Sequence, residues 1–329
     1  MTEGAPSARV CVLNVPTLEK RMSAEENELL KTPLYDLHLE MGGKMVAFAG
    51  YAMPVQYPLG VMGEHNHTRK AAGLFDVSHM GRLTISGPDA DKWIETLVPG
   101  NIIDLAPNHV RYSMFTNDQG GILDDLMITK RENDLFLVVN AACKEQDVAH
   151  MRAHLPEDFT LTELTDRALV ALQGPKAAEV LARFAPGADE MDFMTYQEVT
   201  ICGADCYISR SGYTGEDGHE ISIPADKAEE VCRALLAEAE VEAIGLGARD
   251  SLRLEAGLCL YGHDLTPETT PVEGSLLWAI SPRRREEGGF PGDKIILAQI
   301  ASKDHVKKRV GILPPGPAPS REGTSIFNA

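Results

Sequence analysis

Two adjacent carboxylates, Asp124 and Asp125, lie in the middle of an apolar segment that runs from Ile122 to Thr129. The glycines before it, Gly120 and Gly121, favour a tight turn. Side chains of a strand alternate between its two faces, so each aspartate shares a face with aliphatic residues. An unpaired charge is costly in apolar surroundings, and we therefore expect at least one carboxylate in an interior or a cavity.

A carboxylate in such a place is a candidate catalytic group, because burial and neighbouring charges change its proton affinity. It can accept a proton or stabilise a developing cation. A structural interpretation stays open beside this one: Asp124 completes the turn, and Asp125 is paired inside the sheet. The spacing alone does not decide between the two.

Two further charged residues lie downstream, beginning with Glu220 on a predicted strand from His219 to Ile223 that follows the loop Gly212 to Gly218. A carboxylate on a buried strand face can accept two N–H donors from a flat heterocycle, although an internal salt bridge is equally compatible with the pattern. Arg249 opens an amphipathic helix. Its guanidinium suits a ligand carboxylate, with a structural role as the alternative.

The elements that position these residues alternate between helices and strands, with a loop expected at 51–58 and a strand pair turning on Gly81. The predicted strands are 45–49, 74–85, 110–115, 122–129, 135–139, 169–173, 199–202, 206–209 and 219–223. The predicted helices are 32–40, a polar helix around 65–70, 88–97, 146–155, 176–184, 225–238 and 246–256. Units of strands followed by a helix occur at least twice, which predicts an α+β fold with two pseudo-repeated halves.

The two ends of the chain differ from its middle. We expect residues 1–31 to be a disordered extension and residues 32–273 to form the core. In the remaining segment, 274–329, the stretch Arg283 to Gly289 has a charged and flexible composition. Val310 to Leu313 is predicted as a strand, and Ser325 to Ala329 as the start of another. A lone strand does not close a domain, so this segment reads as incomplete.

Composition excludes several classes of function. The formal net charge is −18 and the pI about 5.0, which disfavours nucleic-acid surfaces and adhesion to anionic membranes. No apolar run approaches the roughly 18 residues of a membrane span. The six cysteines are dispersed, which favours reduced thiols, and we interpret Cys202 and Cys206 as buried small apolar residues. No zinc spacing and no dinucleotide-binding motif are present, so we expect no metal and no nucleotide.

Five motifs stand in one order along the chain and together resemble the aminomethyltransferase family, the T-protein of the glycine cleavage system. The similarity runs from about Lys31 to Asn328, and five co-ordered motifs make a chance match improbable. The motifs are Phe48-Ala49-Gly50-Tyr51-Ala52-Met53-Pro54, Phe75-Asp76-Val77-Ser78-His79-Met80-Gly81, Gly120-Gly121-Ile122-Leu123-Asp124-Asp125, Gly212-Tyr213-Thr214-Gly215-Glu216-Asp217-Gly218 and Gly247-Ala248-Arg249-Asp250-Ser251-Leu252-Arg253-Leu254-Glu255-Ala256.

The resemblance implies a multi-domain cloverleaf around a central folate channel, with antiparallel sheets, packed helices and a carboxyl-terminal β-barrel domain. It implies transfer of a methylene carbon from the aminomethyl-lipoyl arm of H-protein to tetrahydrofolate, with release of ammonia and formation of 5,10-methylenetetrahydrofolate. Tetrahydrofolate is then the co-substrate and lipoylated H-protein a transient partner, with the other glycine cleavage components involved indirectly. No nucleic acid, membrane or metal is implied.

The resemblance also assigns roles to single residues. Asp125, the second of the pair, corresponds to the catalytic carboxylate. Glu220 corresponds to the residue that recognises the pteridine ring, and Arg249 belongs to the folate site. The remaining pocket residues are Tyr112, Asn140 and Met80.

The chain departs from the family at its carboxyl end, where it only begins the barrel domain, and we interpret it as the product of a truncated gene model. Related folate proteins are the rivals. The flavin-containing demethylases carry a GxGxxG motif that is absent here, and the iron–sulfur maintenance proteins carry a late Lys-Gly-Cys-Tyr-type motif, whereas no cysteine follows Cys259. A demethylase of sulfur compounds would keep the folate site.

Without a transit signal we expect a bacterial-type cytoplasmic location, with the mitochondrial matrix as the alternative.

Overall fold

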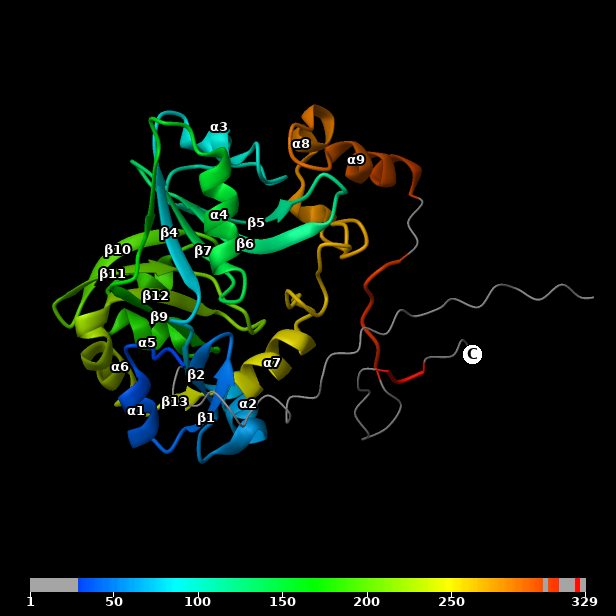
Figure 1. The fold of residues 1–329 in the computed structure, drawn as a ribbon. Helices are drawn as coiled ribbons and strands as arrows, with labels where there is room; N and C mark the ends of the chain where they lie inside the picture. The colour runs from blue at the N-terminus through cyan, green and yellow to red at the C-terminus, as the bar shows by residue number, and fades with distance from the viewer. Residues whose placement is uncertain (1–28, 304–306, 314–322, 326–329) are drawn as a thin grey trace, which may run out of the picture. The chain divides into compact units, whose positions relative to one another are not determined.

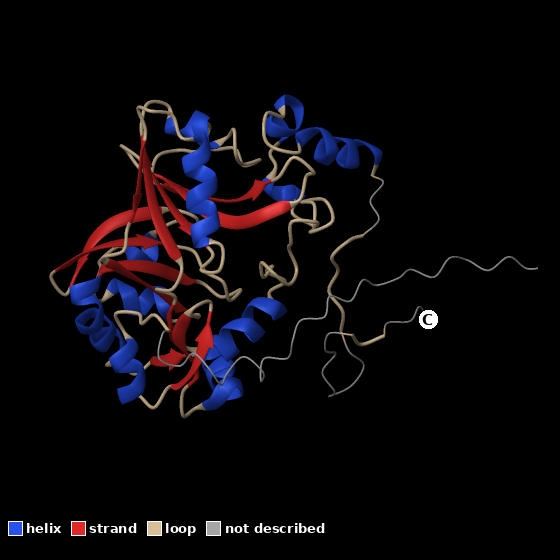
Figure 2. Ribbon diagram, viewed as in Figure 1, coloured by secondary structure: helices blue, strands red, loops and turns tan. Residues whose placement is uncertain are grey.

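The computed structural model describes residues 29–303, 307–313 and 323–325 of the 329-residue chain. Residues 29–309 form one compact unit that contains all helices and strands of the described part. Its strands form a two-stranded ribbon, a six-stranded sheet and a five-stranded sheet, and helices pack on the two larger sheets (Figures 1 and 2). The predicted α+β class is therefore confirmed. The predicted extension 1–31 lies almost entirely outside the described residues.

The five-stranded sheet contains the predicted meander and the two aspartates. Its strand order is β5-β6-β7-β4-β8, and all its pairings are antiparallel. Helix α4 lies along this sheet (Figure 1), and its Val148 and Met151 join the apolar cluster beneath it. The elements are β4 (Gly81–Ser86), α3 (Ala90–Ile94), β5 (His109–Thr116), β6 (Ile122–Lys130), β7 (Leu135–Val139), α4 (Lys144–His154) and β8 (Thr160–Glu163).

The six-stranded sheet has the order β10-β11-β12-β9-β3-β13 and carries Glu220 on β12. Only the pairing of β13 with β3 is parallel. Helices α1, α5 and α6 pack apolar side chains against one face of this sheet in a second cluster. The elements are α1 (Tyr35–Glu40), β3 (Ala72–Asp76), β9 (Arg167–Gln173), α5 (Ala177–Ala182), η2 (Ala188–Glu190), β10 (Tyr196–Ile201), β11 (Ala204–Ser209), β12 (Gly218–Pro224), η3 (Ala225–Lys227), α6 (Ala228–Leu236) and β13 (Val241–Ile244).

A third apolar cluster joins the two sheets and the helix that carries Arg249. Phe136 and Val138 of β7 meet Leu169 and Ala171 of β9 there. Helix α7 (Leu246–Glu255) contributes apolar residues to the same cluster. This packing brings one face of each sheet together, so residues on β6 and on β12 approach a shared interior.

The amino-terminal ribbon corrects one prediction. Residues 51–58, predicted as a loop, contain β2 (Tyr51–Gln56), which pairs with β1 (Lys44–Phe48). Pro54 made this segment resemble a loop, because proline cannot donate to a ladder. A two-stranded ribbon has only edge strands, and the register shifts at Met45, opposite Pro54, which accommodates the proline. Helix α2 (Gly60–Lys70) follows, as predicted.

The predicted strand pair turning on Gly81 is also wrong. Both strands form, but β3 belongs to the six-stranded sheet and β4 to the five-stranded one. The segment Val77 to Met80 crosses from one sheet to the other. A short connection between two apolar strands looks the same in the sequence whether it closes a hairpin or joins two sheets. In the structure β3 pairs with β9 and β4 pairs with β7. These distant strands therefore decide that β3 and β4 do not form a hairpin.

The segment after residue 274 is more ordered than predicted. The stretch 283–289, predicted as flexible, contains most of helix α8 (Pro282–Glu287), which follows η4 (Leu277–Ala279) and precedes α9 (Asp293–Ser302). Residues 310–313, predicted as a strand, form no strand. The other predicted strand, 325–329, lies outside the described residues except for Ser325.

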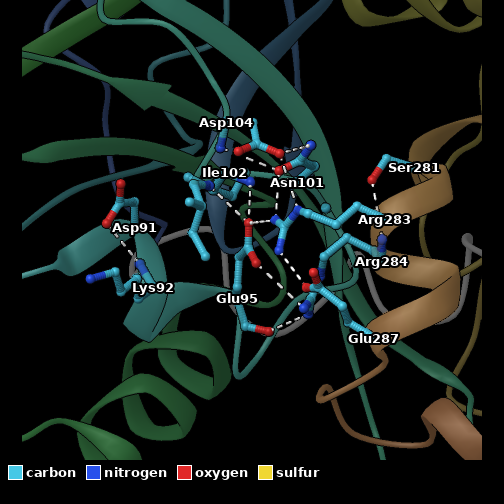
Figure 3. A network of polar contacts seen from close by, with 12 residues as sticks. Asp91, Lys92, Glu95, Asn101, Ile102, Asp104, Ser281, Arg283, Arg284 and Glu287 are labelled. Carbon is cyan, nitrogen blue, oxygen red and sulfur yellow. Dashed lines mark hydrogen bonds and ion pairs between the residues drawn. The ribbon is translucent and has the colours of Figure 1, made fainter.

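A polar network holds α8 against the loop that follows α3 (Figure 3). Glu95 is 3% exposed, and its Oε1 accepts hydrogen bonds from the N–H groups of Ile102 and Ile103 at 2.7 and 2.8 Å. Arg283 Nη2 lies 2.6 Å from the same oxygen. Arg284, 4% exposed, donates to the carbonyl of Glu95 at 2.6 Å and lies 3.4 Å from its Oε2. We call these residues the Glu95 clasp, and it explains why a charged segment is helical here.

Two smaller observations complete the fold. The free thiol of Cys206 is buried as predicted, whereas that of Cys202 is exposed, because Cys202 occupies the tip of the β10–β11 hairpin with a positive φ of 50°. Within the described part of the chain, no helix combines the length and the apolar character that crossing a bilayer requires.

Candidate functional site

The two aspartates of β6 have different surroundings. Burial alternates along the strand, so Asp124 is fully buried and Asp125 is half-buried on the opposite face. The prediction that at least one carboxylate enters the interior is therefore confirmed. Its structural alternative is partly correct as well, since both carboxylates have hydrogen-bond partners. Pairing and chemistry are compatible here, because Asp125 is only half-buried.

Neutral donors hold Asp125 in place. Tyr112 on β5 donates its hydroxyl to Asp125 Oδ2 at 2.9 Å, and the amide Nδ2 of Asn140 lies 2.7 Å from Oδ1. Asn140 follows the end of β7 and also donates to Asp124 from its backbone N–H and its side chain. Three residues predicted for one pocket, Asp125, Tyr112 and Asn140, are thus in direct contact.

The proton affinity of Asp125 is set by this environment. Burial and the negative charge of Asp124 raise the pKa of Asp125 to about 7, although the hydrogen bonds from Tyr112 and Asn140 oppose the rise. A carboxyl group with this pKa exchanges protons near neutral pH, as a general base should. It also remains ionised in a substantial fraction of molecules, which suits stabilisation of a neighbouring cation.

The glycine pair before β6 has two separate functions. Gly120 has a φ of 79°, in the left-handed region that favours glycine. Gly121 instead provides space, because a Cβ atom there would lie 1.7 Å from the carbonyl oxygen of Pro267. The loop around Pro267 therefore packs directly on the start of β6, where Ile122 N–H donates to the carbonyls of Thr266 and Thr269.

Glu220 lies on β12 at a cavity between the two sheets. The empty volume of this cavity is about 350 Å³, part of which is open to solvent. Its walls include Glu220, Met127 and Ser209. Ser211 donates to Glu220 Oε2 at 2.9 Å. Asp125 is not among the lining residues, but Met127 stands two positions along the same face of β6.

Arg249 lies on α7 and is oriented by aromatic and acidic neighbours. Its guanidinium carbon is 4.8 Å from the centre of the Tyr213 ring, and Glu220 is its acidic neighbour. Burial lowers the pKa of Arg249, whereas the charge of Glu220 opposes this effect. Its Nη1 is buried without a hydrogen-bond partner among the described residues. An unpaired buried guanidinium N–H is costly, and an anionic or carbonyl group of a ligand would satisfy it.

Met80 and two aromatic residues complete the surroundings. Met80 packs with Met127 against the cluster that joins the sheets, and its place in the pocket stays a prediction. Tyr213, which sequence reasoning did not single out, lies within electrostatic reach of both Asp125 and Arg249. Trp278 was also missed; its ring stacks on Tyr112 at 5.1 Å, and its side chain is 66% exposed. The glycine-rich loop could have drawn attention to Tyr213, but nothing local distinguishes Trp278.

Comparison with known proteins decides the family. A family model described as the GCVT N-terminal domain matches residues 34–284, which is more than half of the chain. The chain belongs to this family. A mitochondrial aminomethyltransferase from Dictyostelium discoideum is 49% identical over 325 residues, which cover 94% of this chain and 80% of that protein. A human mitochondrial aminomethyltransferase is 48% identical over 322 residues, covering 95% and 79%.

A solved structure agrees with this membership. The glycine cleavage system aminomethyltransferase T from Bartonella henselae superposes with a TM-score of 0.79 at 45% identity, covering 83% of this chain and 75% of that one. The predicted resemblance to the glycine cleavage aminomethyltransferases is confirmed, and these relatives support the prediction of an enzyme of the aminomethyltransferase type. Among the described residues, no group of three or more histidine, cysteine, aspartate and glutamate side chains is arranged to hold a metal ion.

Proposed function

We propose that this member of the aminomethyltransferase family transfers the methylene carbon of an aminomethyl group, carried on the lipoyl arm of an H-protein, to tetrahydrofolate. Ammonia leaves, and 5,10-methylenetetrahydrofolate is formed. The observation that carries the proposal is the half-buried carboxylate of Asp125, held by Tyr112 and Asn140 with a pKa near neutrality. The similarity to curated aminomethyltransferases supports the same reaction.

Asp125 would act mainly through its charge. Transfer to an amine of the folate passes through nitrogen-centred cations, and a fixed carboxylate beside the reacting nitrogen stabilises them as they develop. Because the pKa of Asp125 is about 7, the same group can accept a proton from the attacking amine. The donors Tyr112 and Asn140 hold the carboxylate still, so little reorganisation is needed during the reaction.

The residues that we assign to the site have the chemistry that binding a folate requires. Glu220 Oε2 accepts from Ser211, and the carboxylate retains capacity for N–H donors of a flat pterin. Arg249 offers the unpaired Nη1, while Tyr112, Met80 and Tyr213 supply apolar and aromatic surface beside Asp125. These assignments, including pteridine recognition by Glu220, rest on this fit and on the family resemblance. We also propose a channel that joins the cavity at Glu220 to Asp125.

The larger context follows from the family. Lipoylated H-protein would be a transient partner, and the other glycine cleavage components would interact only through it. The cloverleaf around a central channel, the carboxyl-terminal barrel domain and the division at residues 31 and 273 stay predictions. The curated relatives are named as mitochondrial, which favours the matrix over the cytoplasmic location that we expected.

A reconstituted assay tests the proposal. Aminomethylated H-protein and tetrahydrofolate are mixed with the full chain or with Asp125→Asn, and formation of methylenetetrahydrofolate is followed. We expect the substitution to lower the rate by a factor on the order of 10²–10⁴, because the charge is lost while the shape is kept. Folate binding by calorimetry should persist. Asp118→Asn, an exposed aspartate in the turn before β6, is the matched control and should leave the rate unchanged.

Equal turnover of Asp125→Asn and the unmodified chain would remove Asp125 from the mechanism. Absence of methylene transfer by the unmodified chain, under conditions in which a homologous enzyme is active, would contradict the proposed function itself.

A further inference from the structure

Directly behind Asp125, a second pair of carboxyl groups lies in the interior between β6 and α4. Asp124 is 0% exposed, and Asp147, on the first turn of α4, is 1% exposed. The two carboxyl groups are close enough that the negative charge of Asp124 raises the pKa of Asp147. Neither residue contacts the space between the sheets, so direct contact with a substrate does not explain why two buried acids stand together at this point.

The partners of the two acids are unequal. Asp124 accepts from the backbone N–H of Asn140 at 3.0 Å and from its Nδ2 at 2.9 Å. The thiol of Cys143 is a further neighbour of Asp124. Among the described residues, neither side-chain oxygen of Asp147 has a hydrogen-bond partner. A buried carboxylate without donors, beside another carboxylate, is strongly destabilised. Asp147 must therefore carry the proton of the pair.

The remaining titratable groups near the pair agree with this assignment. Burial and the charges of Asp124 and Asp125 raise the pKa of Asp147 to about 10, so the acid form persists through neutral pH. No cation contacts the pair within the described part of the chain. The other titratable groups near it are Asp125 on β6, Cys143 before α4, and Tyr261 in the segment after α7.

The pair is linked to Asp125 through one side chain. Asn140 Nδ2 lies 2.9 Å from Asp124 Oδ1 and 2.7 Å from Asp125 Oδ1. An ionised Asp124 requires that Asn140 present its amino group, because the amide oxygen would be repelled by both carboxylates. The same orientation supplies Asp125 with one of its donors. The state of Asp124 thus determines how Asn140 holds Asp125.

We propose that Asp147 is a positioning residue for the transfer reaction: its carboxylic acid donates a hydrogen bond that keeps Asp124 ionised, and Asp124, through Asn140, fixes the orientation of Asp125. The inference rests on the proposed function for its catalytic consequence. The protonated state of Asp147 is a separate claim about the free protein. Loss of the acid should let Asp124 take up a proton, which would release Asn140 and remove a negative charge from behind Asp125.

Two substitutions of the full chain test the proposal by activity. In Asp147→Asn an amide N–H replaces the acid O–H, so we expect kcat and its pH profile to stay within about three-fold and within a few tenths of a pH unit of the unmodified chain. Asp147→Leu has no donor. We expect kcat to fall by about 10- to 100-fold while folate affinity is kept, because Asp125 is displaced. The acid limb of the profile should move down by about one pH unit, since the like charge of Asp124 is neutralised.

A matched control separates positioning from stability. Met151→Ala, one turn further on the same helix, removes a fully buried side chain from the apolar cluster without contacting Asp124. It should lower stability yet leave the pH profile unchanged. An unchanged profile and kcat in Asp147→Leu would overturn the proposal. Loss of activity in Asp147→Asn equal to that in Asp147→Leu would also overturn it, because the amide retains the required donor.

A measurement without turnover distinguishes this inference from the proposed function. A protonated carboxylic acid has a carbonyl stretch in the infrared spectrum that a carboxylate lacks. At about pH 8.5 Asp125, with its pKa of about 7, is mostly ionised, whereas Asp147, with its pKa of about 10, is not. We expect the band in the unmodified protein at this pH, and we expect folded Asp147→Asn to lack it. If the band is missing at this pH, or persists in Asp147→Asn, the assignment fails whatever reaction the enzyme catalyses. The spectrum also decides the case if Asp147→Leu does not fold.

Discussion

The hydroxyl of Tyr112 donates a hydrogen bond of 2.9 Å to Asp125 Oδ2, across the antiparallel pair β5–β6. Tyr112 is paired with Met127 and Asp125 with Met114, so the two side chains meet along one face of the sheet. Trp278 stacks on the tyrosine ring. This relationship links a residue of the late segment to the proposed catalytic carboxylate through a single aromatic ring.

Removal of the tyrosine hydroxyl should alter the pH dependence of the reaction. The hydrogen bond stabilises the ionised form of Asp125, so Tyr112→Phe raises the pKa of Asp125 above about 7. The acid limb of the pH–rate profile should then move to higher pH by about one unit, with a loss of about five-fold at pH 7 that recovers at alkaline pH. Steady-state rates between pH 5 and 9 provide the measurement. Tyr196→Phe, whose hydroxyl contacts Arg131 and Glu198, serves as the control. A profile that does not move would show that the hydroxyl has no influence on Asp125.

Substitution of the cavity carboxylate should weaken folate binding. Glu220→Gln loses the charge that would pair with pterin N–H groups, and a charge-assisted hydrogen bond is worth about 1.5–3 kcal/mol. We expect the dissociation constant for tetrahydrofolate, measured by calorimetry, to rise about 10- to 100-fold. Glu198→Gln, on the exposed face of β10 in the same sheet, should leave it unchanged. Equal affinities for Glu220→Gln and the unmodified chain would count against pteridine recognition.

Disruption of the Glu95 clasp should destabilise the protein. Glu95→Gln leaves the buried guanidinium of Arg284 without a countercharge, and loss of one partner of a buried ion pair costs about 3–5 kcal/mol. The free energy of unfolding in urea measures the effect. Glu163→Gln breaks the more exposed ion pair with Arg152 and should change this free energy by less than about 1 kcal/mol. Similar losses for the two substitutions would mean that burial does not strengthen the clasp.

Low pH should weaken the contact between α1 and β3 that His38 and Asp76 form. Burial alone would raise the pKa of Asp76, but hydrogen bonds from His38, Ser78 and Thr32 outweigh burial and lower it below its usual value. A carboxylate with a depressed pKa contributes stability above its unfolded pKa, near 4, and this contribution is lost as pH falls through the folded pKa.

The comparison of Asp76→Asn with the unmodified chain isolates this contribution. At pH 7 the substitution should cost about 3 kcal/mol, because it breaks a buried pair with His38 that is 2.8 Å long. The difference in the free energy of unfolding should begin to narrow below about pH 4, where Asp76 takes up a proton in the unfolded chain, and should continue to narrow until pH reaches the lower pKa of Asp76 in the folded protein. A difference that stays constant from pH 7 to pH 3 would contradict the assignment of the charge to Asp76.

Local pattern was enough to predict how β6 presents its two aspartates. The strand period of two places Asp124 and Asp125 on opposite faces, and the burial of the strand follows that alternation. The meander of β5, β6 and β7 was predictable for the same reason, since each strand is an apolar run bounded by turn residues. The family could be recognised from five short motifs because their order and spacing are independent of any knowledge of the fold.

Other features depended on contacts between distant parts of the chain. The sequence has the same appearance whether β3 and β4 pair with each other or enter different sheets, and the structure separates them. Helix α8 forms in a stretch that looked flexible. Ser281 caps its start locally, and Glu95, far away in sequence, accepts hydrogen bonds from Arg283 and Arg284.

The chain by itself therefore determined the alternation of β6, the α+β class and the family. Tertiary structure decided which aspartate accepts the hydrogen bond of Tyr112 and which asparagine contacts both carboxylates. It also decided that Asp147 lies near Asp124. The physical reason is that the strand period is a local property of the backbone. Hydrogen bonds between side chains, and the proton affinities that they set, depend on the register of strands and helices that are remote in sequence.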